Sequence, residues 1–261
     1  MRRAYLLALA ALVLPGVAGA SPPPSGVVHV AVPPGTPARE HGYQLYAANC
    51  VSCHGAGGSG IITPGRSRGA GDIAGSGPPL RGVGALAADF YLRTGLMPLQ
   101  HAGDQPRRSR VLFSDREIRA LVAYVASLGG GPAIPRPHPG RGSLSEGMRL
   151  FTEHCAGCHQ IVAEGGTVTG AVAPPLGDAT VTQIAEAVRI GPYLMPRFPR
   201  SQISDRQLDS IIAYVERSKH PVDRGGWGIG HLGPVPEGLV AWLLAGGVLV
   251  AVSSLIGRRL R

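Results

Sequence analysis

Hydrophobic residues recur at helical spacing in four short stretches of this 261-residue chain. In each stretch the apolar positions lie three or four residues apart, which predicts a helix with one buried face. The four sets are Gly42, Leu45 and Tyr46; Ile118, Leu121, Val122 and Val125; Gly147, Leu150 and Phe151; and Leu208, Ile211, Ile212 and Val215. The pattern predicts a helical protein.

Polar residues that favour helix starts stand before these stretches. Three pairs have the spacing of a capping box, in which a Ser at the N-cap is followed three residues later by Glu or Gln. The pairs are Ser114 with Glu117, Ser143 with Glu146, and Ser204 with Gln207. The helix that begins at Ser114 is expected to end near Leu128. Thr36 and Pro37 suit the N-cap and N1 positions of the first helix.

The second half of the chain repeats the first. The Gly, Leu and aromatic residues of the first stretch return 105 residues later, and so does a Cys-x-x-Cys-His motif. Further repeated segments are Pro78-Pro79-Leu80 with Pro174-Pro175-Leu176, Leu96-Met97-Pro98 with Leu194-Met195-Pro196, and Ala123-Tyr124-Val125 with Ala213-Tyr214-Val215. The copies differ mainly in the lengths of their loops. Helix patterns that persist while loops vary indicate two copies of one fold.

The repeated motif comprises Cys50, Cys53 and His54 in the first copy and Cys155, Cys158 and His159 in the second, and it uses all four cysteines. Two thiols at this spacing followed by His are typical of covalent attachment of a c-type haem, with the His as an axial iron ligand. One zinc ion or two disulfides are the alternatives, but neither requires a His after each pair. A thioredoxin-like motif would need a βαβ pattern, which is not visible. The sequence therefore predicts two covalently bound haem c groups.

Met97 and Met195 are the predicted second axial ligands. Each follows its Cys-x-x-Cys-His motif and directly precedes a proline. A thioether opposite the His is common in c-type centres and raises the reduction potential. His101 and His41 are the rivals in the first copy. Met148 is not a candidate because it lies in a first helix, before the motif, where the first copy has a tyrosine.

The two ends of the chain predict export and anchoring. Residues 1–20 have a positive start, an apolar run and a small-residue cleavage pattern, typical of a signal peptide, with an uncleaved anchor as the alternative. Residues 239–256 form an uncharged run of 18 residues, about 27 Å as a helix against a ~30 Å hydrocarbon core. Arginines at 258, 259 and 261 place the C-terminus in the cytoplasm and the haem domains outside.

Composition fits small domains built around a cofactor. Aromatic residues are only 5%, charged residues 16%, and Gly (39) and Pro (24) are abundant. The net charge is +9, but five of the arginines lie in the terminal segments, which argues against a nucleic-acid partner. The Gly-rich loop 55–77 lacks the preceding strand and the Lys-Ser/Thr ending of a phosphate-binding loop.

The repeat resembles the class I cytochrome c fold over residues 36–130 and 141–221. The resemblance implies an all-α protein of two tandem class I cytochrome c domains plus one C-terminal transmembrane helix, with the first and last helices of each domain crossing. The implied contacts are Gly42 and Tyr46 with Leu121 and Tyr124, and Gly147 and Phe151 with Ile211 and Tyr214. It also implies that the carbonyl groups of Pro78 and Pro174 hold the other ring nitrogen of each haem-ligating His.

The segment from Arg224 to Gly238, leading into the apolar run, extends the resemblance to the dihaem cytochrome c subunit of the actinobacterial bcc complex, a menaquinol–cytochrome c reductase. This implies an electron-transfer subunit without a bond-making site of its own. The implied partners are the cytochrome b subunit, the Rieske iron–sulfur subunit and the copper centre of a terminal oxidase. The expected segments are a signal peptide (1–20), linker (21–35), domain 1 (36–130), linker (131–140), domain 2 (141–221), juxtamembrane segment (222–238), transmembrane helix (239–256) and tail (257–261).

Two other functions stay open on the sequence alone. A dihaem peroxidase would need one iron without a Met ligand. A dihaem subunit of another oxidase or of a periplasmic dehydrogenase would share both domains; in the cbb-type oxidase subunit the anchor precedes the haem domains, whereas here a convincing span follows them.

Overall fold

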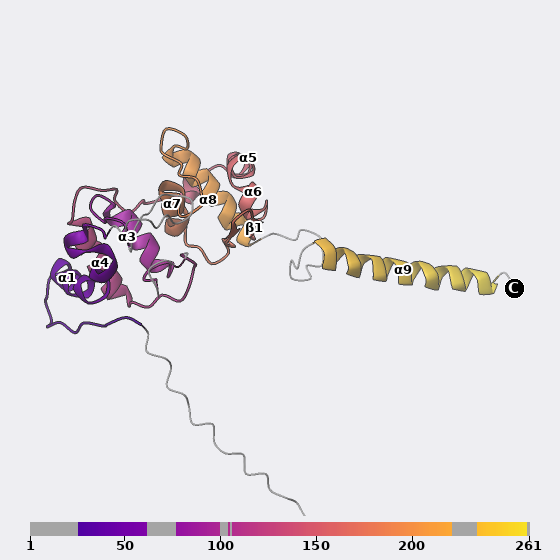
Figure 1. Cartoon of the computed structure of the whole chain (residues 1–261). Coiled ribbons are helices and arrows are strands. Elements are labelled where there is room, and N and C mark those ends of the chain that lie inside the picture. Colours follow the sequence, from indigo (N-terminus) through magenta and orange to yellow (C-terminus); the bar gives the residue numbers. More distant parts are fainter. Residues whose placement is uncertain (1–25, 62–76, 100–103, 105, 221–233, 260–261) are drawn as a thin grey trace, which may run out of the picture. The chain divides into compact units, whose positions relative to one another are not determined.

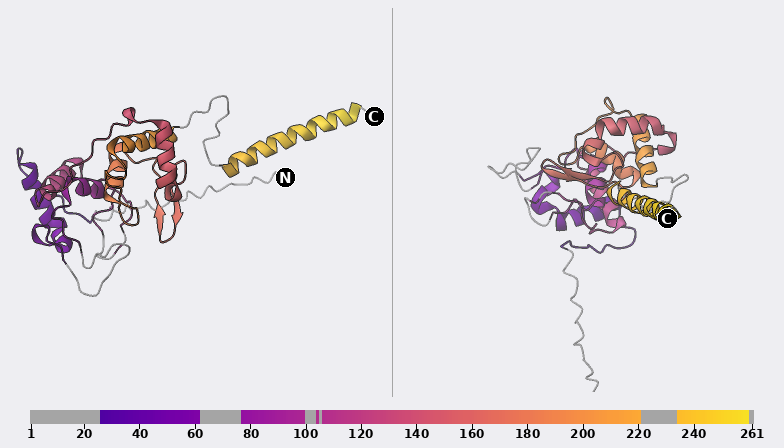
Figure 2. Two further views of the ribbon diagram at one scale, coloured as in Figure 1. Left: turned by 90° about the horizontal axis from the view of Figure 1, so that it is seen from above. Right: turned by 90° about the vertical axis from the view of Figure 1, so that its right-hand side faces the viewer.

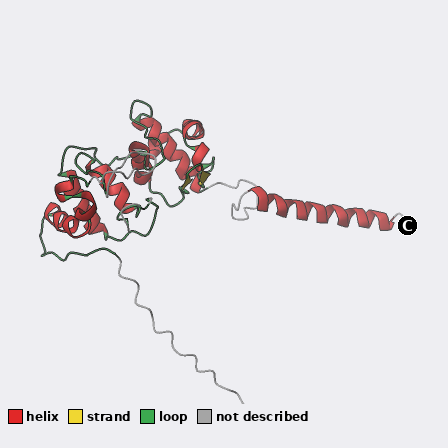
Figure 3. Cartoon of the chain, viewed as in Figure 1, coloured by secondary structure: helices red, strands yellow, loops and turns green. Residues whose placement is uncertain are grey.

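The computed structural model describes residues 26–61, 77–99, 104, 106–220 and 234–259 (Figure 1). It divides after Glu216 into two units, which are described separately. Helices and loops make up nearly all of the described chain, and one short hairpin is the exception (Figure 3). The expected all-α class, with two cytochrome-type domains and a C-terminal apolar helix, is confirmed apart from this small sheet.

The first domain is organised around two crossing helices. Its elements are α1 (Ala38–Asn49), α2 (Val51–His54), η1 (Ala56–Gly58), α3 (Gly84–Arg93) and α4 (Asp115–Ala126). At Gly42 a Cβ atom would collide with the carbonyl group of Ala120, so glycine allows α1 and α4 to approach this closely. The rings of Tyr46 and Tyr124 pack beside the crossing, 5.1 Å apart. Leu121, the expected partner of Gly42, lies in the same core. The residue that Gly42 contacts directly is Ala120, next to Leu121 in the chain.

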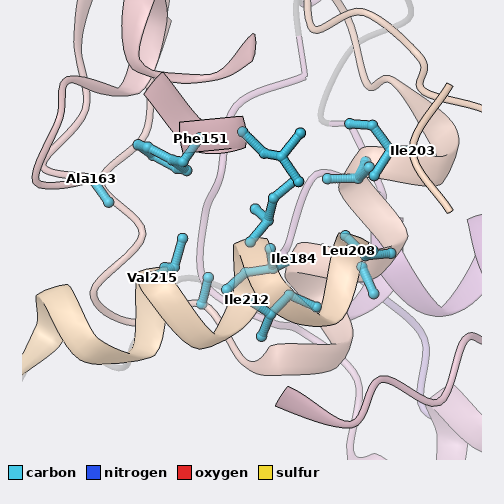
Figure 4. Close-up of a cluster of buried hydrophobic side chains, with 12 residues drawn as sticks. Phe151, Ala163, Ile184, Ile203, Leu208, Ile212 and Val215 are labelled. Atoms are coloured by element: carbon cyan, nitrogen blue, oxygen red, sulfur yellow. The ribbon is translucent and has the colours of Figure 1, made fainter. Parts of the chain in front are cut away.

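The second domain repeats this crossing. Its elements are η2 (Pro139–Arg141), α5 (Leu144–His154), α6 (Ala156–His159), β1 (Gly166–Val168), β2 (Ala171–Ala173), α7 (Val181–Ile190) and α8 (Asp205–Lys219). Gly147 lies against the carbonyl group of Ser210, and the rings of Phe151 and Tyr214 are 5.3 Å apart. Figure 4 shows Phe151, Ile184 and Ile212 among the side chains of one apolar cluster.

Two helix starts differ from the sequence prediction. α1 begins at Ala38, with Pro37 in the N-cap position, because the Thr36 hydroxyl donates to the carbonyl group of Pro33 instead of capping the helix. In α5 only half of the predicted box forms. The Ser143 hydroxyl accepts from the Glu146 N–H, but the Glu146 carboxylate accepts from the Ser210 hydroxyl, which in turn accepts from the Ser143 N–H. The helix start is thereby tied to α8.

The other two capping boxes are confirmed. At Ser114 and Glu117 both reciprocal bonds are present, and the same holds for Ser204 and Gln207. α4 ends at Ala126, slightly before the expected Leu128, which lies in the turn that follows.

A hairpin in the second domain was not predicted. Its strands β1 and β2 pair antiparallel, with Thr167 opposite Val172. Three residues per strand are too few to show a period-two pattern.

The C-terminal unit contains α9 (Pro234–Arg259), a single continuous helix (Figure 2). Residues 235–259 are long and apolar enough to cross a membrane, and the helix is unburied in the structure. It contains the whole predicted run 239–256 and continues past both ends. The expected signal peptide and the segment 222–233 lie outside the described residues.

Candidate functional site

Both Cys-x-x-Cys-His motifs adopt the same backbone turn. α1 ends at Asn49, and the N–H of the next residue, Cys50, donates to the Tyr46 carbonyl over 2.8 Å. The N–H groups of Cys53 and His54 both donate to the Cys50 carbonyl, at 3.2 and 2.9 Å. This turn, which is α2 with Cys50 at its N-cap, therefore carries the two thiols and the imidazole within five consecutive residues.

The second motif repeats these bonds. The Cys155 N–H donates to Phe151 over 2.8 Å, and those of Cys158 and His159 donate to Cys155 at 3.1 and 2.9 Å. Since two independent sequences give one geometry, the turn follows from the motif and from the helix before it.

All four cysteines are free thiols, so neither pair adopts the disulfide alternative. The described residues, which include all four, show no gathering of three or more His, Cys, Asp or Glu side chains suited to a metal ion. Burial, followed by the neighbouring Cys53, raises the pKa of Cys50 to about 12; burial and Cys158 raise that of Cys155 to about 11.

The imidazole of each motif is held by a proline carbonyl. His54 Nδ1 lies 2.8 Å from the Pro78 oxygen, and His159 Nδ1 lies 3.0 Å from that of Pro174. A carbonyl only accepts, so Nδ1 carries a hydrogen, and the neutral form of the ring then has its lone pair at Nε2. Burial lowers the pKa of His159, which favours the neutral ring. A neutral imidazole with a free Nε2 is what an iron ligand requires.

The loops that follow each His are fixed by aromatic hydroxyl groups. Tyr46 donates to the Gly55 carbonyl over 2.7 Å, and Tyr214 donates to that of Ile161 over 2.7 Å. The first bond comes from the first helix of its domain and the second from the last helix. The two domains therefore fix the loop after the His with tyrosines from different helices. Sequence reasoning treated these tyrosines as packing residues only, because a hydroxyl partner in a loop leaves no local pattern.

The predicted methionines lie on the loops between the third and last helices of each domain. Met97 is half-buried, and its N–H donates to Tyr91 over 3.0 Å. Met195 is half-buried and packs against the core cluster that also contacts Cys155. Of the rivals, His41 is buried with Nε2 3.0 Å from the Val30 carbonyl, and His101 lies outside the described residues.

An arginine that the sequence did not single out closes the Met195 loop. The Arg189 guanidinium, at the end of α7, donates to the carbonyl groups of Phe198 and Ile203 at 3.0 and 2.7 Å, and to Asp205 at 2.8 Å. Arg200 and then Arg189 hold the pKa of Asp205 below its usual value. In the first domain Arg93 donates to Asp115 over 2.6 Å. The sequence does contain a pattern that could have identified this arginine. In both copies an Arg stands two residues before a Gly, and an Asp follows the Ser that caps the last helix.

The chemistry of each donor set fits a covalently held haem. Two thiols share one turn with an imidazole whose Nδ1 is bonded to a proline carbonyl, and a thioether is carried by a loop of the same domain.

Family models match both domains. A cytochrome c model matches residues 40–129, and a model of subunit III of cbb3-type cytochrome c oxidase matches residues 142–215.

Whole-chain relatives carry a common description. The cytochrome bc1 complex cytochrome c subunit of Corynebacterium diphtheriae is 35% identical over 238 residues, 84% of this chain and 80% of that protein. The protein of the same description from Mycobacterium tuberculosis (strain H37Rv) is 35% identical over 263 residues, 97% of this chain and 90% of that protein. The cbb3-type cytochrome c oxidase subunit CcoP of an Azospirillum strain is 28% identical over 205 residues, 67% of this chain and 60% of that protein.

Proposed function

This chain belongs to the family of cytochrome bc1 complex cytochrome c subunits, and from that premise we propose that it holds two haem c groups, one per domain, and relays electrons from a quinol-oxidising complex to a terminal oxidase. The observation that carries the proposal is the pair of identical turns, each with two thiols and an imidazole locked through Nδ1. A bound haem supplies a reversible one-electron couple at its iron.

The chain's own residues have distinct tasks in this proposal. Cys50 and Cys53 in the first domain, and Cys155 and Cys158 in the second, form the thioether links. His54 and Met97, and His159 and Met195, would hold the iron of each haem. Pro78 and Pro174 fix the tautomer of each His. With two protein side chains as ligands, each iron would support electron transfer and not oxygen or peroxide chemistry.

The proposed setting is a membrane complex. As a bc1 complex subunit the chain associates with the other subunits of that complex, among which we infer the cytochrome b and Rieske iron–sulfur subunits. The acceptor is the copper centre of an oxidase. α9 anchors the chain, and Arg258 and Arg259 place its end in the cytoplasm, with both haem domains on the outer face. We propose that the two haem domains span residues 36–130 and 141–221.

The test is a count of covalent haem. Pyridine haemochrome analysis of the purified full chain is expected to give two thioether-linked haems per polypeptide. A Cys50→Ala/Cys53→Ala variant is expected to keep one, and so is Cys155→Ala/Cys158→Ala. Fewer than two in the unmodified chain contradicts the proposal.

A second candidate is a subunit of a cbb3-type oxidase, favoured by the family model that matches residues 142–215. Gentle solubilisation and affinity purification of the tagged chain distinguishes the two. The bc1 assignment predicts co-purification of a cytochrome b subunit even from cells lacking any cbb3-type catalytic subunit. Its absence, together with recovery of such a subunit from wild-type cells, favours the second candidate.

A further inference from the structure

Two helices join the domains of the first unit. α3 and α7 pack against each other, and their contact includes polar bonds. The Gln183 side chain donates to the carbonyl group of Arg93 over 3.3 Å and accepts from Arg108 over 3.4 Å. The interface between the domains therefore contains polar groups that bond to each other across it.

At the centre of this contact lies a carboxyl group without a donor. The Glu186 side chain on α7 is 0% exposed, and neither of its oxygens has a hydrogen-bond donor among the described residues. Asp89 on α3 faces it and is 4% exposed. An unpartnered buried carboxylate costs several kcal/mol or more, so the arrangement calls for a proton.

The neighbouring charges decide which carboxyl group carries the proton. Arg93 Nε donates to both oxygens of Asp89, at 2.8 and 3.0 Å, and its Nη1 donates to Asp115. Asp89 is thus the ion-paired member. On the helix of Glu186, Arg189 directs its terminal nitrogens to Phe198, Ile203 and Asp205. Its Nε has no hydrogen-bond partner in the part of the chain that the structure describes.

Electrostatics agrees with this geometry. Burial first, and then the negative charge of Asp89, raise the pKa of Glu186 to about 8, although Arg93 opposes the shift. Two facing carboxyl groups in a dry site do not both ionise readily. A proton on Glu186 turns it into the donor that Asp89 accepts from.

We propose that Glu186 and Asp89 form a proton-binding site between the two domains, in which one shared proton holds α7 against α3. The site is distinct from both Cys-x-x-Cys-His turns. Its ligand is the proton, supplied and removed by solvent when the interface opens locally.

The site lies between the helices that lead into both methionine loops, so its protonation is expected to affect electron transfer. This expectation rests on the proposed function, whereas the proton site itself does not. α3 ends at Arg93, shortly before Met97, and α7 ends at Ile190, shortly before Met195. Loss of the proton sets two negative charges against each other across the helices that lead into both methionine loops. We expect the domains to separate more often and haem-to-haem transfer to slow as the pH rises past about 8.

The first test is the pH dependence of stability in the full-length protein with its haems. A carboxyl group whose pKa is raised on folding binds more protons in the folded state, so stability falls as pH rises between its ordinary value and about 8. For one proton, the unfolding equilibrium constant rises up to about tenfold per pH unit in that window. The Glu186→Gln variant donates permanently to Asp89 and is expected to lose this contribution to the slope.

The matched control is Glu164→Gln, which changes an exposed carboxyl group of the same domain and is expected to keep the wild-type slope. Equal slopes in wild type and Glu186→Gln overturn the proposal. Haem content is measured on the same samples. A missing haem contradicts the proposed function, whereas the proton site is tested by the slope of stability against pH alone.

A second measurement needs no variant that might misfold. Infrared spectra of the wild-type protein are expected to show a protonated carboxylic acid at neutral pH that disappears with a midpoint near 8. The Asp89→Asn variant is expected to shift this midpoint, because the amide donates to an ionised Glu186. Absence of a protonated carboxyl group at neutral pH in the wild type overturns the proposal.

Discussion

The Arg189 side chain is buried and bonds to two carbonyl groups of the segment that follows Met195 and to the start of α8. Arg189→Leu leaves the carbonyl groups of Phe198 and Ile203 without their donor, which is expected to destabilise the second domain by about 2–4 kcal/mol. The red absorption band of thioether-ligated ferric haem should fall to half, because only one loop is released. Chemical denaturation and visible spectra measure both effects.

The control for this change is Arg206→Leu, since Arg206 is exposed on the neighbouring turn of α8. It is expected to alter stability by less than about 0.5 kcal/mol. An unchanged band in Arg189→Leu contradicts a role in holding Met195.

The two methionines make a separate prediction. Met97→Leu and Met195→Leu are each expected to remove half of the thioether–iron band and to lower the reduction potential of one haem, because a thioether ligand raises it. Redox titration of each variant assigns the two potentials. If one substitution leaves the band unchanged, that iron has no Met ligand, and the dihaem peroxidase alternative gains support.

Residue-level prediction from sequence is possible where the chemistry is local. The thiols and imidazole of each motif lie within five residues, so their spacing alone predicts a role for them. The roles of the Tyr46 hydroxyl, Arg189 and Glu186 were not predicted, because the groups they meet are brought close only by packing. Glu186 and Asp89 even lie on different domains.

At the scale of elements, glycine at the helix crossing sets the distance between the first and last helices. A Cβ atom at Gly147 would overlap the Ser210 carbonyl, so Gly147→Ala is expected to cost about 1–3 kcal/mol through separation of α5 and α8. The midpoint of urea unfolding measures this. Gly140→Ala, where an added Cβ meets no atom within 4 Å, is the control and should change the midpoint little.

Sequence patterns located α1, α4, α5 and α8 because each has an apolar stripe and most have a polar cap. α3 was missed because Val83 stands at its N-cap and makes no side-chain bond there, so no start signal exists. α7 does have a signal, since Thr180 and Gln183 form a capping box in the structure. Loop-bounded helices next to a cofactor depend on packing more than on periodicity.

At the scale of the whole molecule, the helical anchor is a separate unit. A chain ending at His220 is expected to keep both haems and to move from the membrane fraction to the soluble fraction, because α9 is the one described helix long and apolar enough to span a bilayer. Fractionation with haem staining tests this. Retention of the shortened chain in membranes under high salt would show that another segment or a partner holds it there.

The continuous run of backbone bonds from the first helix into the Cys-x-x-Cys-His turn has a consequence for how these domains can evolve. Residues after a deletion in an α-helix rotate by about 100° around its axis, while the glycine crossing keeps the earlier part of the helix in place. Losing one residue between Gly147 and Cys155 would therefore rotate the two thiols and the imidazole together, away from the orientation that the glycine crossing sets for them. The number of residues in this connection is therefore fixed by the rotation that each residue adds around the helix axis. The loops that follow the His in the sequence can vary in length.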